Sequence, residues 1–263
     1  MMSSIKLLPN FIKFIFSLRS VVILSLISVS VLIIAIFGST KVGGFGTNAS
    51  ISILGNIVPF TLLNMIFNNV YMVLTLAILI ITIQISEFLF FGHFAQGYIC
   101  KYRDRYPVLV AYLISTASIA IITALLYTTY YIPISPSLKH YFSALLFSTL
   151  YFYMIIIGTT LVINFSIIRK YTILIMIFLF FITPITAKLV IPMISNAGFY
   201  NSLLKNLMIG IEKMTSIHVE FSNQAENIIR TGLIKEGVLM ESVAFMSIYV
   251  FIIGYQYMRK DFS

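Results

Sequence analysis

Long apolar runs, separated by short stretches that collect most of the polar residues, make up most of this chain. Crossing ~30 Å of hydrocarbon takes about 20 apolar residues, because each helical residue rises ~1.5 Å. By this measure the pattern predicts six membrane-spanning helices, at residues 20–38, 59–88, 107–129, 141–166, 171–193 and 239–257. The expected fold class is therefore an all-α membrane protein, and the run at 59–88 is long enough to tilt or break.

Two prolines stand where predicted helices begin. Pro59 opens the second apolar run and Pro107 opens the third. Proline suits the first turn of a helix, since the N–H that it lacks would have no helical partner there. Both positions therefore support the predicted starts.

Composition agrees with the membrane class. Of the 263 residues, 60% are hydrophobic and 10% charged, with a mean hydropathy of +1.02, whereas soluble domains have roughly 45–50% apolar and about 25% charged residues. We expect a single transmembrane domain over residues 1–263, with no room for a large soluble one. The net charge of +9 comes without a long basic run, so membrane lipids rather than nucleic acid are expected partners. The single cysteine, Cys100, cannot form an internal disulfide.

Lysine and arginine collect at alternate ends of the predicted spans. Ten of them fall on one side: Lys6, Lys13, Arg19, Lys101, Arg103, Arg105, Arg169, Lys170, Arg259 and Lys260. The short loops on the other side hold only Lys41 and Lys139. Because cytoplasmic loops carry the excess of basic residues, we expect a multi-pass protein of the cell membrane with both termini in the cytoplasm.

Two segments outside the spans have helical patterns of their own. Polar residues at intervals of 4, 3 and 4 put one polar face on residues 4–18, so the stretch 1–19 is expected to form an interfacial helix. A cleaved signal peptide is the alternative, but the apolar run is long for one and no small-residue cleavage site follows. Residues 194–238 have apolar residues at helical spacing. We expect amphipathic helices there, on the outer side of the membrane.

Residues that carry common catalytic or metal chemistry are scarce. The two aspartates, Asp104 and Asp261, cannot build the aspartate-rich metal motifs of membrane prenyl- and phosphatidyl-transferases. The three histidines, His93, His140 and His218, fall in different loops, so no metal-binding spacing arises. A G-x-x-x-x-G-K-[ST] phosphate loop is also missing. We therefore expect no enzyme and no bound cofactor, and active transport would draw its energy from another subunit or an ion gradient.

Polar residues inside the spans are candidates for a translocation path. Asn64, Asn68 and Asn69 cluster in the outer half of the second span, and Asn164 lies near the inner end of the fourth. Hydrogen bonding between helices is the simpler interpretation of these amides, and lining a wet substrate path is the functional one. Glu87 is the ionisable candidate in the second span, near its cytoplasmic end.

Charge is concentrated between the second and third spans, in EFLFFGHFAQGYICKYRDRYP, residues 87–107. Lys101, Arg103, Asp104 and Arg105 lie within five residues there. The simplest interpretation is a positive-inside topology signal. A contact with another protein is compatible with that signal, because a short cytoplasmic loop is open to a partner.

Two motifs in this sequence point to one family. Gln96-Gly97 is followed by Tyr98-Ile99-Cys100 and then by Pro107, and the chain ends in Tyr257-Met258-Arg259-Lys260-Asp261-Phe262. This resembles the permeases of type-2 ATP-binding-cassette (ABC) exporters, which have a short cytoplasmic coupling helix with a polar residue before a Gly, and a tail of aromatic, basic and acidic residues. The Glu usually found near that Gly is absent unless Glu87 replaces it, and the basic residue that often follows the Pro is missing.

The resemblance implies a transmembrane subunit that forms the substrate path, pairs with a second permease subunit and docks two copies of a separate ABC ATPase, which binds ATP and Mg²⁺. Residues 92–106 would be the coupling segment, with Gly97 permitting a bend, the tyrosines as apolar anchors and the basic residues facing an acidic rim. The implied coupling residues are Gln96, Gly97, Tyr98, Lys101, Tyr102, Arg103, Asp104 and Arg105.

A protein that works without a cytoplasmic partner is the alternative. It would be an ion-coupled secondary carrier, or an immunity or scaffold factor. In the carrier, Glu87 would matter more than the basic loop, since ion coupling needs an ionisable group at depth.

Overall fold

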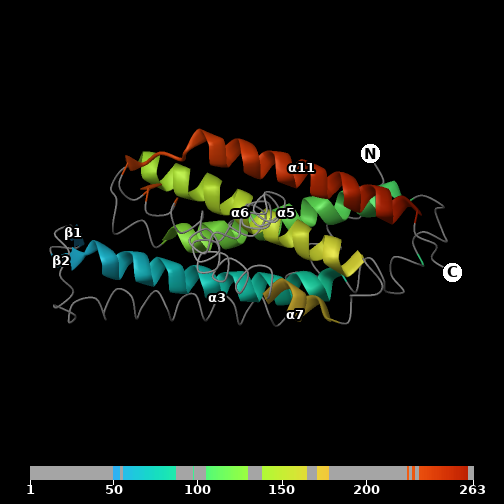
Figure 1. Cartoon of the computed structure of the whole chain (residues 1–263), viewed down its shortest axis with the longest axis horizontal. Coiled ribbons are helices and arrows are strands. Elements are labelled where there is room, and N and C mark those ends of the chain that lie inside the picture. The colour runs from blue at the N-terminus through green and yellow to red at the C-terminus, as the bar shows by residue number, and fades with distance from the viewer. Residues whose placement is uncertain are drawn as a thin grey trace, which may run out of the picture.

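The computed structural model of the chain describes residues 50–53, 56–86, 97, 105–129, 138–164, 171–177, 224, 227–228 and 231–259. Helices dominate these ranges (Figure 1). The elements are β1 (Ser50–Ile53), β2 (Asn56–Pro59), α3 (Phe60–Ser86), α5 (Tyr106–Thr128), α6 (Leu138–Asn164), α7 (Thr172–Ile177) and α11 (Glu236–Arg259).

Four of the predicted helices are confirmed, with ends shifted by at most three residues: those at 59–88, 107–129, 141–166 and 239–257. Within the described ranges, α5, α6 and α11 are each long and apolar enough to cross a membrane. The chain is therefore a membrane protein. α7 opens the predicted span at 171–193; the rest of that span, the one at 20–38 and the interfacial helix at 4–18 lie outside the described residues, so six spans stay a prediction.

α3 runs uninterrupted for 27 residues, the same length as α6. Its second half, Val73–Ser86, is predominantly apolar but shorter than a full membrane span. Pro59 is the last residue of β2 and immediately precedes the helix, so it stands one position before the first turn in which it was expected.

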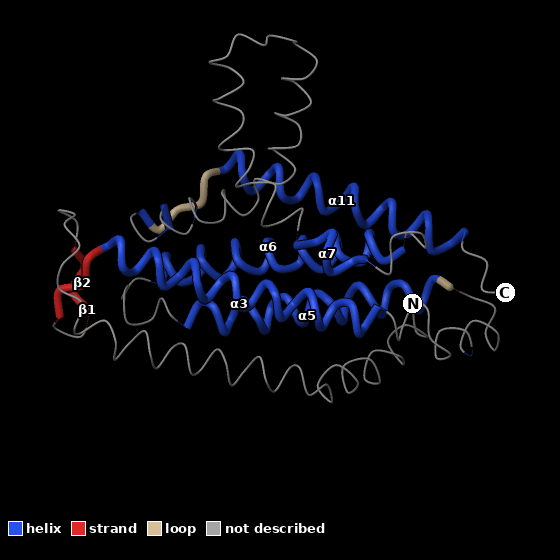
Figure 2. Tube along the Cα trace, turned by 60° about the horizontal axis from the view of Figure 1, so that its bottom comes forward, coloured by secondary structure: helices blue, strands red, loops and turns tan. Residues whose placement is uncertain are grey.

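A short antiparallel hairpin departs from the all-helical expectation. β1 pairs with β2 in the register Ser50↔Pro59, Ile51↔Val58, Ser52↔Ile57 and Ile53↔Asn56. The alternation Ser-Ile-Ser-Ile has the period of two that strands require, and β-branched residues favour it. Figure 2 shows the hairpin at the end of the bundle where α3 begins.

α3, α6 and α11 run in one direction, and α5 runs in the other (Figure 1). The ends of α3, α6 and α11 therefore lie beside the start of α5. Successive membrane crossings run in alternate directions, which agrees with α3, α5, α6 and α11 as the second, third, fourth and sixth predicted spans. The arrangement brings distant parts of the sequence together at one end of the bundle.

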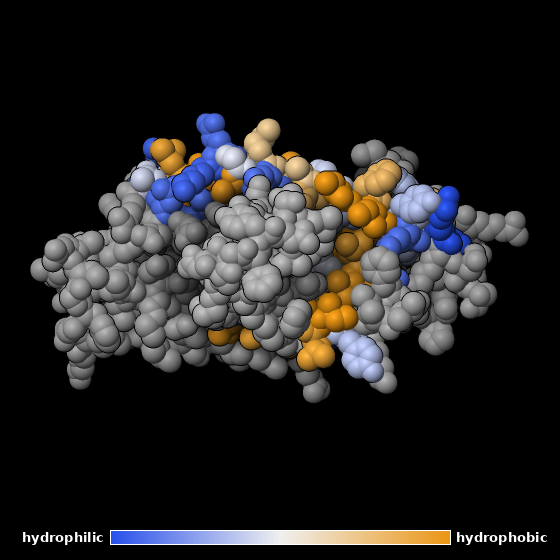
Figure 3. All heavy atoms as spheres, in the orientation of Figure 1, coloured by the Kyte–Doolittle hydropathy of each residue, from blue (hydrophilic) through white to orange (hydrophobic). Residues whose placement is uncertain are grey.

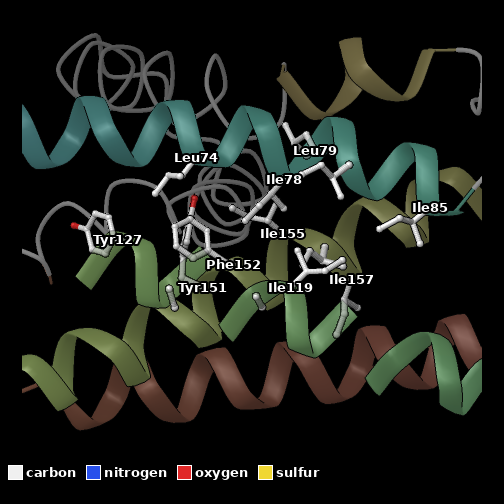
Figure 4. Packing of buried hydrophobic residues seen from close by; sticks show 14 of the residues in the cluster. Leu74, Ile78, Leu79, Ile85, Ile119, Tyr127, Tyr151, Phe152, Ile155 and Ile157 are labelled. Atoms are coloured by element: carbon white, nitrogen blue, oxygen red, sulfur yellow. The ribbon is translucent and has the colours of Figure 1, made fainter. Parts of the chain in front are cut away.

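α6 lies at the centre of the described bundle, in contact with α3, α5, α7 and α11. Between α3 and α6, Leu74 and Ile78 of one helix face Tyr151, Phe152 and Ile155 of the other (Figure 4), and all five are buried. In a bilayer such packing holds helices together by close van der Waals contact, because lipid chains are as apolar as the side chains themselves.

α11 packs differently from the central helices. Its buried residues are Ile253 and Tyr257, whereas Val243, Ile248 and Phe251 are exposed. Figure 3 shows hydrophobic groups along this part of the surface, with hydrophilic groups toward the two ends of α11. An exposed apolar band between polar ends is the form expected of a helix at the edge of a membrane bundle.

Candidate functional site

Two of the eight predicted coupling residues, Gly97 and Arg105, belong to the described part of the chain. The other six lie outside it: Gln96, Tyr98, Lys101, Tyr102, Arg103 and Asp104. Gly97 is exposed, and a Cβ placed on it would meet no atom within 4 Å. Among the described glycines only Gly232 has a positive φ. Neither space nor backbone angle therefore requires glycine at position 97.

Arg105 directly precedes α5 and reaches the far end of α11. Its Nη1 donates a hydrogen bond to the carbonyl oxygen of Met258, at 2.8 Å. Met258 is in the last turn of α11, where carbonyl groups lack helical partners and the helix dipole is negative. The guanidinium therefore caps α11 and ties it to the start of α5. At the same end, Arg259 lies over the ring of Tyr255, 4.4 Å from its centroid.

A chain of three hydroxyl groups joins α3, α5 and α6 near this end. The Tyr112 hydroxyl is 2.8 Å from Ser86 Oγ and 2.5 Å from Thr160 Oγ1. Thr160 Oγ1 donates to the carbonyl oxygen of Ile156, at 2.8 Å. A hydroxyl has one proton, so Tyr112 must donate to Thr160 and Ser86 must donate to Tyr112. All three side chains are buried, and we call them the Tyr112 node.

A second contact of hydroxyl groups lies halfway along the helices. Tyr71 of α3 and Tyr151 of α6 hydrogen-bond through their hydroxyls, with ring centroids 5.1 Å apart in an edge-on arrangement. One turn further along α3, the Thr75 hydroxyl faces Tyr151 but makes no hydrogen bond of normal geometry. The Tyr71–Tyr151 contact is thus a polar link between α3 and α6.

Thr75 and Thr82 of α3 differ from the other buried threonines. Their Oγ1 atoms have no hydrogen-bond partner within the described part of the chain. Five buried threonines elsewhere instead donate to a carbonyl three or four residues earlier: Thr116, Thr123, Thr128, Thr159 and Thr160. A buried hydroxyl without a partner costs about 1–3 kcal/mol. The face of α3 toward α6 therefore has polar capacity that its own backbone does not use.

Polar residues of α3 recur on one helical face. Intervals of 4, 3, 4, 7 and 4 separate Asn64, Asn68, Tyr71, Thr75, Thr82 and Ser86. Such spacing keeps positions on one side of a helix. The predicted path residues Asn64 and Asn68 are thus in line with the hydroxyls, whereas Asn69 is not; the side chains of all three lie outside the description. We call this row the α3 polar seam.

Asn164 adds a further polar side chain on α6, the helix that packs against α3. It is the last residue of α6, one turn beyond Thr160, and its Nδ2 is buried without a hydrogen-bond partner in the described structure. Glu87 follows directly after α3 and lies outside the described residues. The sequences of α3 and α5 contain no charged residue. Along these helices the polar groups can therefore exchange hydrogen bonds with a neutral polar group, but they cannot neutralise an ion.

The opposite end of α6 is tied to the turn that precedes α11. Ser143 Oγ donates to the carbonyl oxygen of Gly232, at 2.9 Å. Gly232 has φ +68°, and a Cβ there would lie 3.0 Å from the ring of His140. Gln224 Oε1 accepts from the backbone N–H of Lys235, at 3.2 Å. The end of the predicted segment 194–238 is thus docked on α6, and α11 begins at Glu236, three residues earlier than expected.

Comparison with known proteins finds no matching family model, and no curated protein sequence matches the chain significantly. Any function must therefore be argued from the residues and their arrangement.

Proposed function

We propose that this chain is the transmembrane subunit of an ATP-driven ABC exporter. One observation carries the proposal. The two stretches with which the chain resembles such permeases, residues 96–107 and the tail at 257–262, are 150 residues apart in sequence, yet their residues Arg105 and Met258 are hydrogen-bonded. A coupling segment and a cytoplasmic tail that serve the same partner should lie at one end of the bundle.

In this proposal two copies of a separate ATPase dock beneath the bundle, and a second permease subunit completes the path. Tyr98 and Tyr102 would be the apolar anchors, since aromatic side chains provide much of the binding energy at interfaces. Lys101 and Arg103 would face acidic residues of the ATPase and fix its orientation. ATP and Mg²⁺ would bind to the partner, whose closure would move the coupling segment and switch the bundle between inward- and outward-open states.

The α3 polar seam is the part of the chain that we propose to line the substrate path. It runs along one face of α3 and includes two buried hydroxyls without partners, Thr75 and Thr82. A substrate with neutral hydrogen-bonding groups would satisfy them when the helices separate. Because the α3 polar seam contains no charged residue, an uncharged or amphipathic substrate is favoured over a small ion.

The arrangement of Arg105 decides how docking should be tested. Reversing the charge of Arg105 would also break its hydrogen bond to Met258, so this change cannot report on docking alone. The Lys101→Glu, Arg103→Glu double variant leaves that bond intact. Lys139→Glu is the matched control, because Lys139 is exposed at the opposite end of α6.

The measurement is co-purification of an ATPase from native membranes. We expect the parent chain and Lys139→Glu to retain the ATPase. The amount of ATPase that co-purifies with the double variant should be at least tenfold lower, although the variant still inserts into the membrane. An ATPase retained in full by the double variant would remove the docking role of this loop. If no ATPase accompanies the parent chain, the stand-alone carrier becomes the better hypothesis, and Glu87→Gln assayed against a pH gradient tests it.

A further inference from the structure

The residues that flank the segment 87–104, Ser86 and Arg105, are both held by contacts between helices. On its N-terminal side, Ser86, the last residue of α3, belongs to the Tyr112 node. On its C-terminal side, Arg105 is bonded to Met258 of α11, and Tyr112 follows two turns into α5. The anchors thus reach α6 through Thr160 and α11 through Met258.

We infer that Tyr112 and Arg105 are positioning residues, which make α6 and α11 follow any displacement of the segment 87–104. The inference rests on the proposed function for what displaces the segment. The anchoring itself requires no partner. Neither residue needs to touch an ATPase or a substrate for this role.

Tyr112 is suited to this role because its hydroxyl crosses between helices. Most buried hydroxyls of α5 and α6 instead bond a carbonyl of their own helix, as Ser115, Thr123 and Ser148 do. Such bonds hold no two helices together. The Tyr112 hydroxyl accepts from α3 and donates to α6, so it links three rigid elements at one point.

The direction of the hydrogen bonds makes the node sensitive to small changes. If α3 moves away from α5, Ser86 loses its acceptor inside an apolar environment and must find another. If α5 moves away from α6, Thr160 keeps its bond to Ile156, but the Tyr112 proton loses its acceptor. A buried polar group without a partner is costly, so concerted movement of the three helix ends is favoured over separation. Packed interfaces of this kind tend to switch between discrete arrangements.

The anchoring is tested with the full chain in lipid nanodiscs, using the single native cysteine. Cys100 lies within the segment, and a nitroxide attached to it reports the mobility of the segment by electron paramagnetic resonance. We expect Tyr112→Phe and Arg105→Gln to increase the mobile fraction of the spectrum at least twofold. Thr123→Val is the control, because Thr123 is buried in the same helix and bonds only Ile119 of that helix.

An unchanged Cys100 spectrum in folded Tyr112→Phe protein would overturn the anchoring. If Tyr112→Phe does not fold, Ser86→Ala and Thr160→Val take its place, because each leaves the Tyr112 hydroxyl one of its two partners. Both should raise the mobile fraction, and the inference fails if neither does.

Whether α6 follows a displacement of the segment, which we call transmission, is tested in the complex with the co-purified ATPase. In a Cys100→Ser background, Leu146→Cys places the nitroxide on an exposed position of α6. Addition of Mg-ATP and vanadate should change its spectrum. Tyr112→Phe should reduce this change by more than half while the ATPase remains bound and hydrolyses ATP, and Thr123→Val should not.

The outcomes separate the two proposals. If the ATPase is bound and active in Tyr112→Phe and the spectral change at the α6 label is as large as in the parent, then Tyr112 does not transmit the displacement to α6. The proposed function would remain intact. The absence of any ATPase would refute the proposed function and the transmission with it. The Cys100 spectra would still decide whether the segment is anchored.

Discussion

The hydrogen-bonded buried hydroxyl groups in the described ranges have two kinds of partner, a carbonyl of their own helix or a group of another helix. A threonine such as Thr123, which donates to a carbonyl of its own helix, satisfies its proton without fixing a neighbour. Tyr112 and the Tyr71–Tyr151 pair reach across helices. These tyrosines therefore link neighbouring helices, each at its own depth in the bundle.

Among the glycines in the described ranges, Gly232 is the one whose backbone conformation favours glycine. Its φ of +68° lies in the left-handed region, and a Cβ on this residue would lie only 3.0 Å from atoms of the His140 ring. A side chain in this conformation costs roughly 1–2 kcal/mol. Gly232→Ala should therefore lower the stability of the folded protein by about that amount or more, measured by thermal unfolding in detergent.

Gly254→Ala serves as the comparison, because the same change meets ordinary surroundings there. Its Cβ would lie 3.7 Å from Leu109, and alanine is favoured over glycine within a helix by roughly 0.5–1 kcal/mol. We expect unchanged or slightly raised stability. Equal loss at both glycines would show that the left-handed turn is not what matters at Gly232.

Arg105 shows what sequence can say about a residue and what it cannot. Basic residues near it predict a cytoplasmic loop, and that prediction concerns charge alone. The hydrogen-bond acceptor, Met258, is 153 residues away, and nothing local marks it. The Tyr112 node is similar, although the regular spacing of polar residues along α3 is a signal from which part of the seam could have been read.

At the scale of the helices, α6 and α11 should respond differently to loss of an aromatic ring. Phe152 of α6 is fully buried against the rings of Tyr127 and Tyr151, whereas Phe251 of α11 is 75% exposed. Phe152→Ala opens a cavity inside the bundle, and Phe251→Ala only exchanges one apolar surface for another.

The expected loss for Phe152→Ala is on the order of 2–3 kcal/mol. This is at or below the low end of the ~3–5 kcal/mol seen in water-soluble cores, because in a membrane the transfer from water is missing and only packing is lost. Phe251→Ala should remain within ~0.5 kcal/mol of the parent chain. Unfolding by SDS titration in mixed micelles measures both, and a large effect at Phe251 would indicate a helix packed on α11.

The Tyr71–Tyr151 contact can be measured by a double-mutant cycle. Tyr71→Phe and Tyr151→Phe each remove one hydroxyl and keep the ring, so the cycle isolates the hydrogen bond. Bonds of this type between membrane helices contribute about 0.6 kcal/mol on average and up to ~1.7 kcal/mol. We expect a coupling energy in that range from SDS titration. Tyr71→Phe combined with the distant Tyr255→Phe should show additive effects instead.

For the molecule as a whole, apolar runs predicted the ends of the four helices α3, α5, α6 and α11 to within three residues, because crossing the hydrocarbon requires a minimum length of apolar helix. The hairpin at Ser50–Pro59 was not predicted, since the alternation of polar and apolar residues covers only the four residues of β1 and is a weak signal beside long apolar runs. Contacts between helices were not predicted either. They depend on how helices rotate against one another, which apolar residues all around a helix leave open.

The orientation of the bundle in the membrane can be tested by labelling Cys100. Because ten basic residues collect on one side of the predicted spans, the segment that contains Cys100 should lie in the cytoplasm. A membrane-impermeant maleimide should then label Cys100 in inside-out vesicles and not in right-side-out vesicles. Lys139→Cys in a Cys100→Ser background should give the opposite pattern, since residue 139 is exposed at the other end of α6. Labelling of Cys100 from outside would place the basic segment away from any cytoplasmic ATPase and would refute the proposed docking.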